Sequence, residues 1–516
     1  MFIRMHIYWH ISCRRNLACL RVVLLPLPPK GTQRVTLATG PIEGQDSSPS
    51  GSLTRLAAPA AALILTAAIC FAPAELSDRA RLALIIFYLA VLGWTFTRIN
   101  DTTIALTAGI ALVVTGVVAS NRLYDALSHD LIWLLLAAFL ISAVLRETGI
   151  TRRVVAVAIR PARTIAHLFY LLTLAIIATA FVIPSTTGRA IVLLPVFLAL
   201  ADAIDDARIA RALALLFPSV ILLSACASLI GAGAHVVAVD FISSQPQGES
   251  IDYLHWALLG LPLALVSSFA ATLAILHGFL TAEERGRAVA LPPPARNGAP
   301  AREFAIGAII LGTVILWMTM RLHGIGMAIV GLAAAVLLTI PSVSGVTLKT
   351  AVRSVEWELI LFLAATIVIG DALMDSGAVR WLAGKLVQGI PSGLALSPAF
   401  VVALVAAVSL LAHLLIVSRT ARATVLIPAV ALPIAGFGYE PTALIFLTAT
   451  ATGFCQTLMV SAKSVVVYGK LEQPTYSAGD LMKLSMILMP VLFIVLLIMS
   501  LYIWPLLGLP LVGRAT

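Results

Sequence analysis

Two stretches of this sequence share a pattern of hydroxyl, cationic and apolar residues. The first, Ser185–Pro195, reads STTGRAIVLLP, and the second, Ser418–Pro428, reads SRTARATVLIP. Both match S-x-T-x-R-A-x-V-L-[LI]-P, and their first residues lie 233 positions apart. A serine before an apolar run is a typical helix N-cap. We therefore expect each stretch to begin a helix whose first turn carries hydroxyl groups and arginine.

These residue types are suited to holding an anion. A helix N-terminus offers unpaired N–H groups and about half a positive charge, and hydroxyl groups add further donors. Two such ends facing one ligand would suit a solute with two negative charges. The sequence predicts substrate contacts at these residues: Ser185, Thr186, Thr187, Arg189, Ser418, Arg419, Thr420 and Arg422. For Arg189 and Arg422 the alternative is structural, a hydrogen bond to exposed backbone carbonyls.

The composition places these motifs in a membrane protein. Of 516 residues, 60% are hydrophobic and 11% are charged, whereas soluble globular proteins carry about 25% charged residues. Long continuous apolar stretches also differ from the alternating pattern of an outer-membrane barrel. The five cysteines are scattered, which indicates neither a disulfide framework nor a metal knuckle. The net charge of +10 fits cationic cytoplasmic loops better than nucleic-acid binding.

Two apolar segments, 167–203 and 397–437, are longer than one membrane pass of about 20 residues, and the polar motifs interrupt them. We expect each to be a re-entrant hairpin with its tip inside the membrane. The predicted fold is all-α and polytopic, with about 11 transmembrane helices besides the two hairpins. These spans are 56–76, 81–98, 102–120, 131–147, 212–242, 254–280, 304–321, 324–341, 357–376, 440–469 and 483–508.

The chain divides into four parts. Residues 1–55 are expected to be a disordered tail or an extension from a start codon assigned too early. A first membrane half, 56–280, and a second, 304–510, flank a cytoplasmic linker, 281–303. With the N-terminus inside, 23 Lys and Arg residues fall on the cytoplasmic side and 7 outside, as the positive-inside rule requires. The other four fall within membrane segments, where a cation is costly: Arg189, Arg419, Arg422 and Lys463.

Further stretches match between the two halves. The sequence LAA at 136–138 precedes LRETG at 145–149, and LAA at 363–365 precedes LMDSG at 373–377. Together with the motifs this indicates two homologous units. An odd number of spans separates equivalent elements, so we expect inverted-topology repeats, which are typical of secondary transporters.

Each half also has a second candidate break, a polar or Gly-rich stretch within an apolar segment. The first lies in 224–242 around Gly231, and the second lies in 448–469. Paired breaks in corresponding positions point to a transport site, so Ser461 and Lys463 join the predicted substrate contacts. His235, directly after the first break, is either a proton relay or a packed core residue.

With these motifs the chain resembles the divalent anion/sodium symporter family, which carries dicarboxylates, citrate or sulfate. The resemblance covers about residues 56–510 and includes the prolines that close each motif and the stretch from Ser461 to Gly469. It implies eleven spans, two re-entrant hairpins and sodium as a candidate coupling ion. The ion-binding positions it implies are Ser185, Gly231, Ser418 and Ser464.

The chain departs from the family pattern at positions tied to sodium. The family has a Ser-Asn-Thr signature at each hairpin tip, and here Thr186 and Arg419 stand in place of the two Asn residues. Lys463 and Ser464 stand in place of a Pro and an Asn. A tip arginine would repel a sodium ion a few ångströms away by several kcal/mol. We expect the second sodium site to be lost and Arg419 or Lys463 to supply a fixed positive charge.

The predicted function is secondary active transport of di- or tricarboxylates or sulfate across the inner membrane by alternating access. The alternatives are a sodium-independent anion exchanger and a metalloid or cation antiporter relative. A membrane-embedded enzyme is not expected, because the sequence contains no HExxH, no GxSxG and no acidic cluster. The absence of a GxxxxGK[ST] loop argues against ATP-driven transport. No cofactor, no bound metal and no nucleic acid are expected; the partners are a small anion, the bilayer and a second copy in a homodimer.

Overall fold

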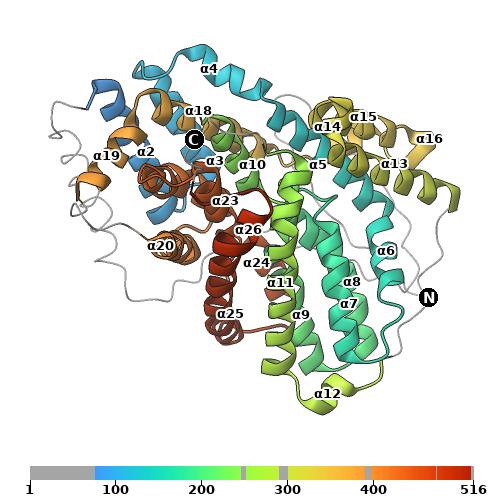
Figure 1. Cartoon of the computed structure of the whole chain (residues 1–516). Coiled ribbons are helices and arrows are strands. Elements are labelled where there is room, and N and C mark those ends of the chain that lie inside the picture. The colour runs from blue at the N-terminus through green and yellow to red at the C-terminus, as the bar shows by residue number, and fades with distance from the viewer. Residues whose placement is uncertain (1–75, 246–250, 290–299, 390–396, 472, 513–516) are drawn as a thin grey trace, which may run out of the picture. The chain divides into compact units, whose positions relative to one another are not determined.

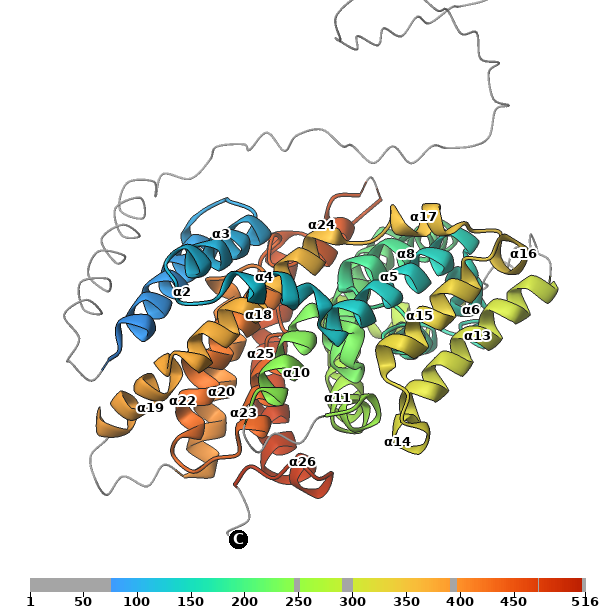
Figure 2. The ribbon, with the colours of Figure 1, turned by 90° about the horizontal axis from the view of Figure 1, so that it is seen from above.

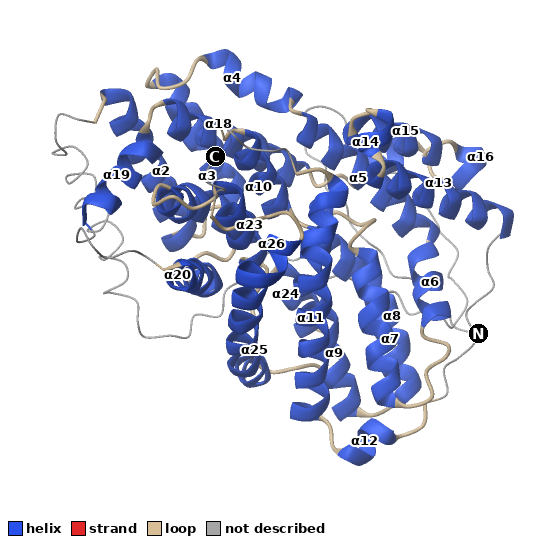
Figure 3. Cartoon of the chain, viewed as in Figure 1, coloured by secondary structure: helices blue, strands red, loops and turns tan. Residues whose placement is uncertain are grey.

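The computed structural model describes residues 76–245, 251–289, 300–389, 397–471 and 473–512 (Figure 1). Regular structure in these residues is helical (Figure 3), and their β pairing is limited to two isolated bridges. The predicted all-α class is confirmed. The predicted N-terminal extension 1–55, nearly all of the predicted span 56–76 and part of the linker lie outside the described residues.

The first half and the start of the linker contain the helices α2 to α12. They are α2 Asp78–Phe96, α3 Asp101–Val114, α4 Ser120–Asp125, α5 Asp130–Thr148, α6 Ile150–Ala158, α7 Ile165–Thr179, α8 Thr186–Ile204, α9 Ala207–Leu223, α10 Gly233–Ser243, α11 Tyr253–Phe279 and α12 Ala282–Gly286. Short 3-10 turns cover Ala126–Ser128, Ser224–Ala227 and Leu229–Gly231.

The helices of the second half begin with α13 and end with α26. They are α13 Pro300–Met318, α14 Met320–His323, α15 Met327–Leu338, α16 Pro341–Ser344, α17 Leu348–Val352, α18 Trp357–Asp375, α19 Ala378–Gly389, α20 Pro398–Leu411, α21 Arg419–Leu426, α22 Leu432–Ala435, α23 Pro441–Ala451, α24 Lys463–Gly469, α25 Ala478–Ile498 and α26 Trp504–Leu506. A 3-10 turn covers Ala412–Leu414, and π-helical turns cover Ile427–Ala431 and Met499–Ile503.

Eight helices among the described residues are long and apolar enough to cross a membrane. Shorter apolar helices of 10–17 residues accompany them, including α7 and α10. A helical chain with this many apolar segments is an integral, polytopic membrane protein. The predicted number of eleven spans stays a prediction.

Both long segments predicted as hairpins are divided into two helical arms. In hairpin 1, α7 ends at Thr179 and α8 begins after Ser185; in hairpin 2, α20 ends at Leu411 and α21 begins after Ser418. The Ser185 hydroxyl accepts a hydrogen bond from the N–H of Gly188 at 3.2 Å, and that of Ser418 accepts one from Ala421 at 3.3 Å. Each motif therefore starts a helix at the serine that the sequence predicts as its cap.

The second candidate breaks also divide helices. The first break, residues 224–232, separates α9 from α10, and the second break, residues 452–462, separates α23 from α24. In the first break a Cβ at Gly231 would lie 2.1 Å from the carbonyl oxygen of Ala225. Only glycine allows the backbone to fold back on itself this closely.

The matching glycines of LRETG and LMDSG end equivalent helices. Gly149 (φ 66°) ends α5 and Gly377 (φ 80°) ends α18, and both are in the left-handed region that glycine adopts at little cost. Each turn leads into a short helix, α6 or α19, which the sequence analysis did not predict.

The two halves interlock (Figure 2). Helix α5 of the first half packs against α15 of the second, and α18 of the second packs against α3 of the first. Likewise, α8 contacts α24 and α10 contacts α21. The order of elements recurs in the two halves, whereas their inverted topology stays a prediction.

The start of the linker is tied to the first half through Asp206, which caps α9. Its carboxylate accepts the N–H groups of Arg208 at 2.9 Å and Ile209 at 3.1 Å, and it pairs with Arg287 at 2.8 Å. These donors, the Ile209 N–H first, hold the pKa of Asp206 below its ordinary value. A depressed folded-state pKa stabilises the fold above the ordinary aspartate pKa, and this stabilisation is lost as the pH falls through the folded value.

We expect Asp206→Ala to lower the free energy of unfolding by about 1 kcal/mol at neutral pH, because α9 loses its cap. The difference from wild type should vanish at pH values below the depressed pKa. Thermal unfolding of the detergent-solubilised protein measures both effects, with the exposed Asp202→Ala as control. An equal loss of stability at neutral and acidic pH would contradict this account.

Candidate functional site at the hairpin tips

Arg189 is fully buried, and its donors are engaged inside the first half. Its Nε donates to Thr179 Oγ1 at 3.0 Å, Nη1 donates to the Ile221 carbonyl at 2.9 Å, and Nη2 donates at 2.7 Å to both the Ile176 carbonyl and Ser224 Oγ. Ile221 lies in the last turn of α9, whose carbonyls lack helical partners and carry partial negative charge. The guanidinium therefore ties hairpin 1 to the end of a broken helix.

Arg422 has the equivalent position in the second half. It is also fully buried, and it donates to the carbonyls of Ile416 at 2.8 Å, Val417 at 3.2 Å and Thr452 at 2.9 Å. Thr452 follows the last residue of α23, so this arginine likewise holds its hairpin to the broken helix of its own half. Both contact sets match the structural alternative for the repeated arginines. Their substrate contact stays a prediction.

Arg419 differs, because it joins the two halves. Its Nη2 lies 2.8 Å from Nε2 of His235, and its Nη1 lies 3.5 Å from the carbonyl of Leu222 in the last turn of α9. A Cβ at Gly453, just after α23, would lie 2.9 Å from the same Nη2. One guanidinium therefore lies near the carboxyl ends of both broken helices.

The donors of Arg419 are incompletely used. Its Nε is buried without a hydrogen-bond partner among the described residues, and its contact with Leu222 is long. A buried donor without a partner costs about 1–3 kcal/mol. In contrast to Arg189, which makes four short hydrogen bonds, Arg419 keeps donor capacity for a ligand at the tip of hairpin 2.

The tips of both hairpins border one group of charged residues, which we call the tip cluster: Asp101, Glu356, Glu358 and Lys463. The Glu356 carboxylate lies near Ser185 and that of Asp101 lies near Ser418. Both carboxylates lie within electrostatic range of Lys463 and Glu358, and Lys463 Nζ is 3.8 Å from Glu358 Oε2. The structure thus brings Ser185, Ser418 and Lys463 to the same region.

Sequence reasoning missed the carboxylates of the tip cluster. Asp101 is the first residue of α3, Glu356 precedes α18 and Glu358 is its second residue. Acidic residues are common at helix N-termini because they complement the helix dipole, so their position along the chain gave no sign of a site. Lys463, with 77% of its side chain exposed, is among these carboxylates, whereas Arg419 is half-buried.

The other predicted residues divide by their surroundings. Thr186 and Thr187 are half-buried at the tip of hairpin 1. Thr420 Oγ1 would lie 2.9 Å from a Cβ at Gly233, the first residue of α10. Ser461 accepts the Leu458 N–H at 3.0 Å within the second break. The ion-binding role of Gly231 and the substrate role of Ser461 stay predictions.

Two polar side chains in and beside the second break are buried without partners among the described residues. Neither the oxygen nor the nitrogen of the Gln456 amide has a hydrogen-bond partner, and the same holds for the Ser464 hydroxyl. Both residues are 1% exposed. Buried polar groups are nearly always paired, so both groups are available to a solute or to water. Gln456 could be found from the sequence, because it is a polar residue within the apolar segment 448–469.

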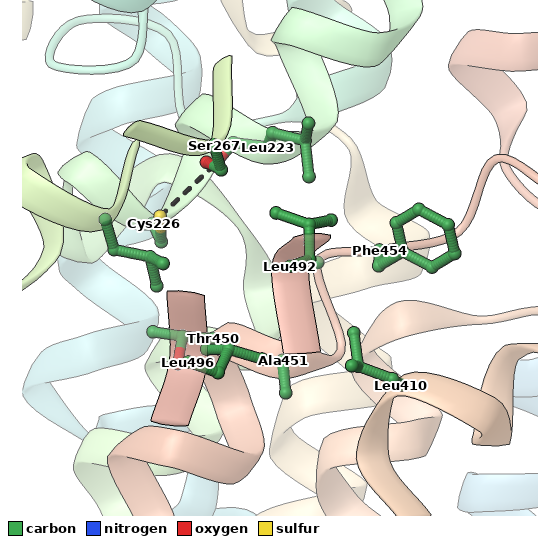
Figure 4. Close-up of a pocket in the computed structure, with 11 residues that line it drawn as sticks. Leu223, Cys226, Ser267, Leu410, Thr450, Ala451, Phe454, Leu492 and Leu496 are labelled. Carbon is green, nitrogen blue, oxygen red and sulfur yellow. Dashed lines mark hydrogen bonds between the residues drawn. The ribbon is translucent and has the colours of Figure 1, made fainter. Parts of the chain in front are cut away.

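A small pocket lies beside the ends of the broken helices (Figure 4). Leu223, Cys226, Gly453 and Phe454 line it, together with mostly apolar residues of α11, α20, α23 and α25. The Cys226 thiol donates to the Leu223 carbonyl at 3.2 Å. This largely apolar lining does not suit a dianion, and none of the predicted site residues belongs to it.

The sequence matches the family described as the sodium:sulfate symporter transmembrane region over residues 51–510. The chain belongs to this family. The match therefore indicates a membrane transporter of the sulfate and carboxylate symporter family.

Similar proteins come from several bacteria. A membrane protein of Cupriavidus necator is 27% identical over 312 residues, which cover 58% of this chain and 60% of that protein. An uncharacterized transporter of Mycobacterium bovis is 25% identical, with 59% of this chain and 71% of that protein covered. The citrate/succinate antiporter of Escherichia coli K12 is 24% identical over 360 residues, covering 66% of this chain and 72% of the antiporter.

A solved structure supports the transporter fold. The YdaH transporter of Alcanivorax borkumensis superposes with a TM-score of 0.53 at 14% sequence identity, and the match covers 84% of this chain and 99% of that one. At this identity the similarity concerns the fold alone.

We expect Arg189→Gln to unfold or aggregate the protein, because it leaves several buried acceptors unpaired at about 1–3 kcal/mol each. Arg419→Gln should cost far less stability, since few of the donors of Arg419 are paired. Size-exclusion chromatography and thermal unfolding in detergent compare the two variants directly. If Arg189→Gln were as stable as wild type and Arg419→Gln were not, the two roles would be reversed.

Proposed function

We propose that this family member is a secondary active transporter of divalent anions, di- or tricarboxylates or sulfate, that crosses the inner membrane and works by alternating access without requiring sodium. The observation that carries the proposal is Arg419 at the tip of hairpin 2, whose buried Nε has no hydrogen-bond partner among the described residues. The similarity to a citrate/succinate antiporter supports this solute class.

The anion would be held by the tips of both hairpins. The helices α8 and α21 each direct an N-terminus with its partial positive charge at this region, and Ser185 and Ser418 place hydroxyls there. Asp101 and Glu356 lie near these serines. An incoming dianion would therefore meet two carboxylates, which makes the tip cluster a competitor for the anion.

The position of Arg419 supports sodium independence. The carbonyl ends of broken helices coordinate sodium ions in many carriers, and here the guanidinium lies near Leu222 and Gly453 at these ends. Its fixed charge would repel a sodium ion nearby by several kcal/mol. The guanidinium of Arg419 would thus take the place of a sodium ion. This favours exchange or another coupling ion over sodium symport.

Uptake of labelled sulfate, succinate and citrate into proteoliposomes tests this function. We expect uptake of at least one of these anions to stay within about twofold when choline replaces sodium. Arg419→Gln should lower it about 10–100-fold, since a hydrogen bond to a charged group is worth about 1.5–3 kcal/mol. The exposed Arg208→Gln, which removes a pair with Glu284, is the control. Strict sodium dependence, absence of any flux, or chemical conversion of the solute would refute the proposal.

Removal of the competing carboxylates should strengthen anion binding. For Asp101→Asn and Glu356→Gln we expect KM for the transported anion to fall about fivefold, equivalent to about 1 kcal/mol for one hydrogen bond. The concentration dependence of initial uptake gives KM, and the exposed Glu283→Gln serves as control. A rise in KM would mean that these carboxylates assist the anion rather than compete with it.

A further inference from the structure

The ring of His235 has one defined protonation pattern in this structure. Its Nδ1 lies 3.0 Å from the carbonyl of Ser228, which can only accept, so Nδ1 carries a proton. Its Nε2 lies 2.8 Å from Nη2 of Arg419, which can only donate, so Nε2 carries none. The imidazole is therefore neutral, and its free lone pair is directed at the guanidinium.

Because of this contact, His235 cannot be protonated while Arg419 lies against it. A proton on Nε2 would face an N–H of Arg419, and two positive charges would meet in a buried site. His235 can be protonated only when Arg419 has moved away. Few hydrogen bonds hold Arg419 in place, because its other hydrogen bond is 3.5 Å long and its Nε has no partner among the described residues.

We infer that His235 takes up a proton when Arg419 turns from it to the bound anion, so that each dianion is carried together with one proton. The inference rests on the proposed function and adds its coupling ion. The proton comes from water on the side from which the anion enters and forms a new N–H bond at Nε2. It returns to water when Arg419 releases the anion and contacts His235 again; Arg419 keeps its proton throughout.

The formal charges of the site favour this ratio. Without a solute the Arg419–His235 pair by itself carries the single positive charge of Arg419, and a dianion bound there would leave the pair with one net negative charge. One proton on His235 brings the sum to zero. Because an uncompensated charge is expensive in low dielectric, the neutral, loaded site would move across the membrane most readily.

Among the described residues, no side chain near His235 offers a negative charge. The ring lies 5.0 Å from that of Trp256 on α11, and the preceding break contributes the Cys226 thiol. Of the helices packed against α10, α23 has no ionisable side chain. Within the described part of the chain, no carboxylate forms an ion pair with His235.

The carboxylates of α18, also packed against α10, have partners elsewhere. Glu358 pairs with Lys463, and Asp371 and Asp375 pair with Arg122. At the far end of α10, Asp240 lies 3.5 Å from His129. On α21, Arg422 is directed at the Thr452 carbonyl. A protonated His235 would therefore find its counter-charge in the bound anion.

His413 provides a matched control. It is also buried, but its Nε2 is 2.7 Å from the Thr457 hydroxyl, which can either donate or accept. No cation has to leave before this ring can change its protonation. The substitution His413→Gln should therefore leave any proton coupling at the wild-type ratio.

The test uses the full chain in proteoliposomes that contain a pH-sensitive dye, with sulfate and succinate as probes and with the membrane potential clamped. Sulfate stays a dianion near neutral pH, so protons that accompany it come through the protein. For succinate, the comparison with variants removes the contribution of its own protonation. We expect one proton per dianion for wild type and for His413→Gln, and a more than fivefold acceleration of uptake by an inward proton gradient. For His235→Gln and His235→Asn the flux that remains should carry no protons.

The outcomes separate this inference from the proposed function. Anion flux without proton movement in wild type would overturn the inference and leave the proposed function standing. Equal proton coupling in wild type and the His235 variants would overturn the role of His235. If neither variant folds, the wild-type ratio alone decides, and a ratio near zero refutes the inference. Absence of flux for every anion would refute the proposed function itself.

Discussion

The structure depends on how buried cations meet the carbonyl ends of interrupted helices. A break inside the membrane exposes carbonyl groups that water cannot reach, and each unpaired group is costly. Arg189 and Arg422 are placed to satisfy these carbonyls in their own halves. Neither forms an ion pair with a carboxylate in the described residues. The partial negative charge of a helix C-terminus offsets the charge of each arginine instead. The repeated arginine of each motif thus makes the break of its own half tolerable.

Arg419 departs from this symmetry, because the equivalent position of hairpin 1 is Thr186. An additional cation lies near the same helix ends, and its neighbour is a neutral histidine of the opposite half. Among the described residues, its Nε has no partner and its bond to Leu222 is 3.5 Å long, whereas Arg189 uses every nitrogen and Arg422, whose Nε is also unpaired, donates to three carbonyls of its own half. The Arg419 guanidinium and the His235 imidazole are in contact here. Many carriers bind a mobile ion at the ends of such broken helices.

The packing between the two halves connects the Arg419–His235 contact to both hairpins. Hairpin 2 packs against α10 of the first half, while hairpin 1 packs against α24 of the second. A movement of one hairpin therefore changes the surroundings of the opposite break. The tip cluster adds a second connection, since carboxylates from α3 and from the start of α18 interact with the tip serines.

The sequence by itself determined the features that depend on neighbouring residues. The apolar composition determined the membrane class, Ser185 and Ser418 marked the helix starts, and the repeated glycines marked the ends of α5 and α18, because caps and left-handed turns are local. The tertiary structure alone decided which groups those residues meet. Glu356 reaches Ser185, Asp101 reaches Ser418 and Arg419 reaches His235 across long separations in the chain, and no local pattern encodes such pairs. For the same reason, sequence reasoning recognised the four costly cations but left open which of them anchor helices and which keeps donors for a solute.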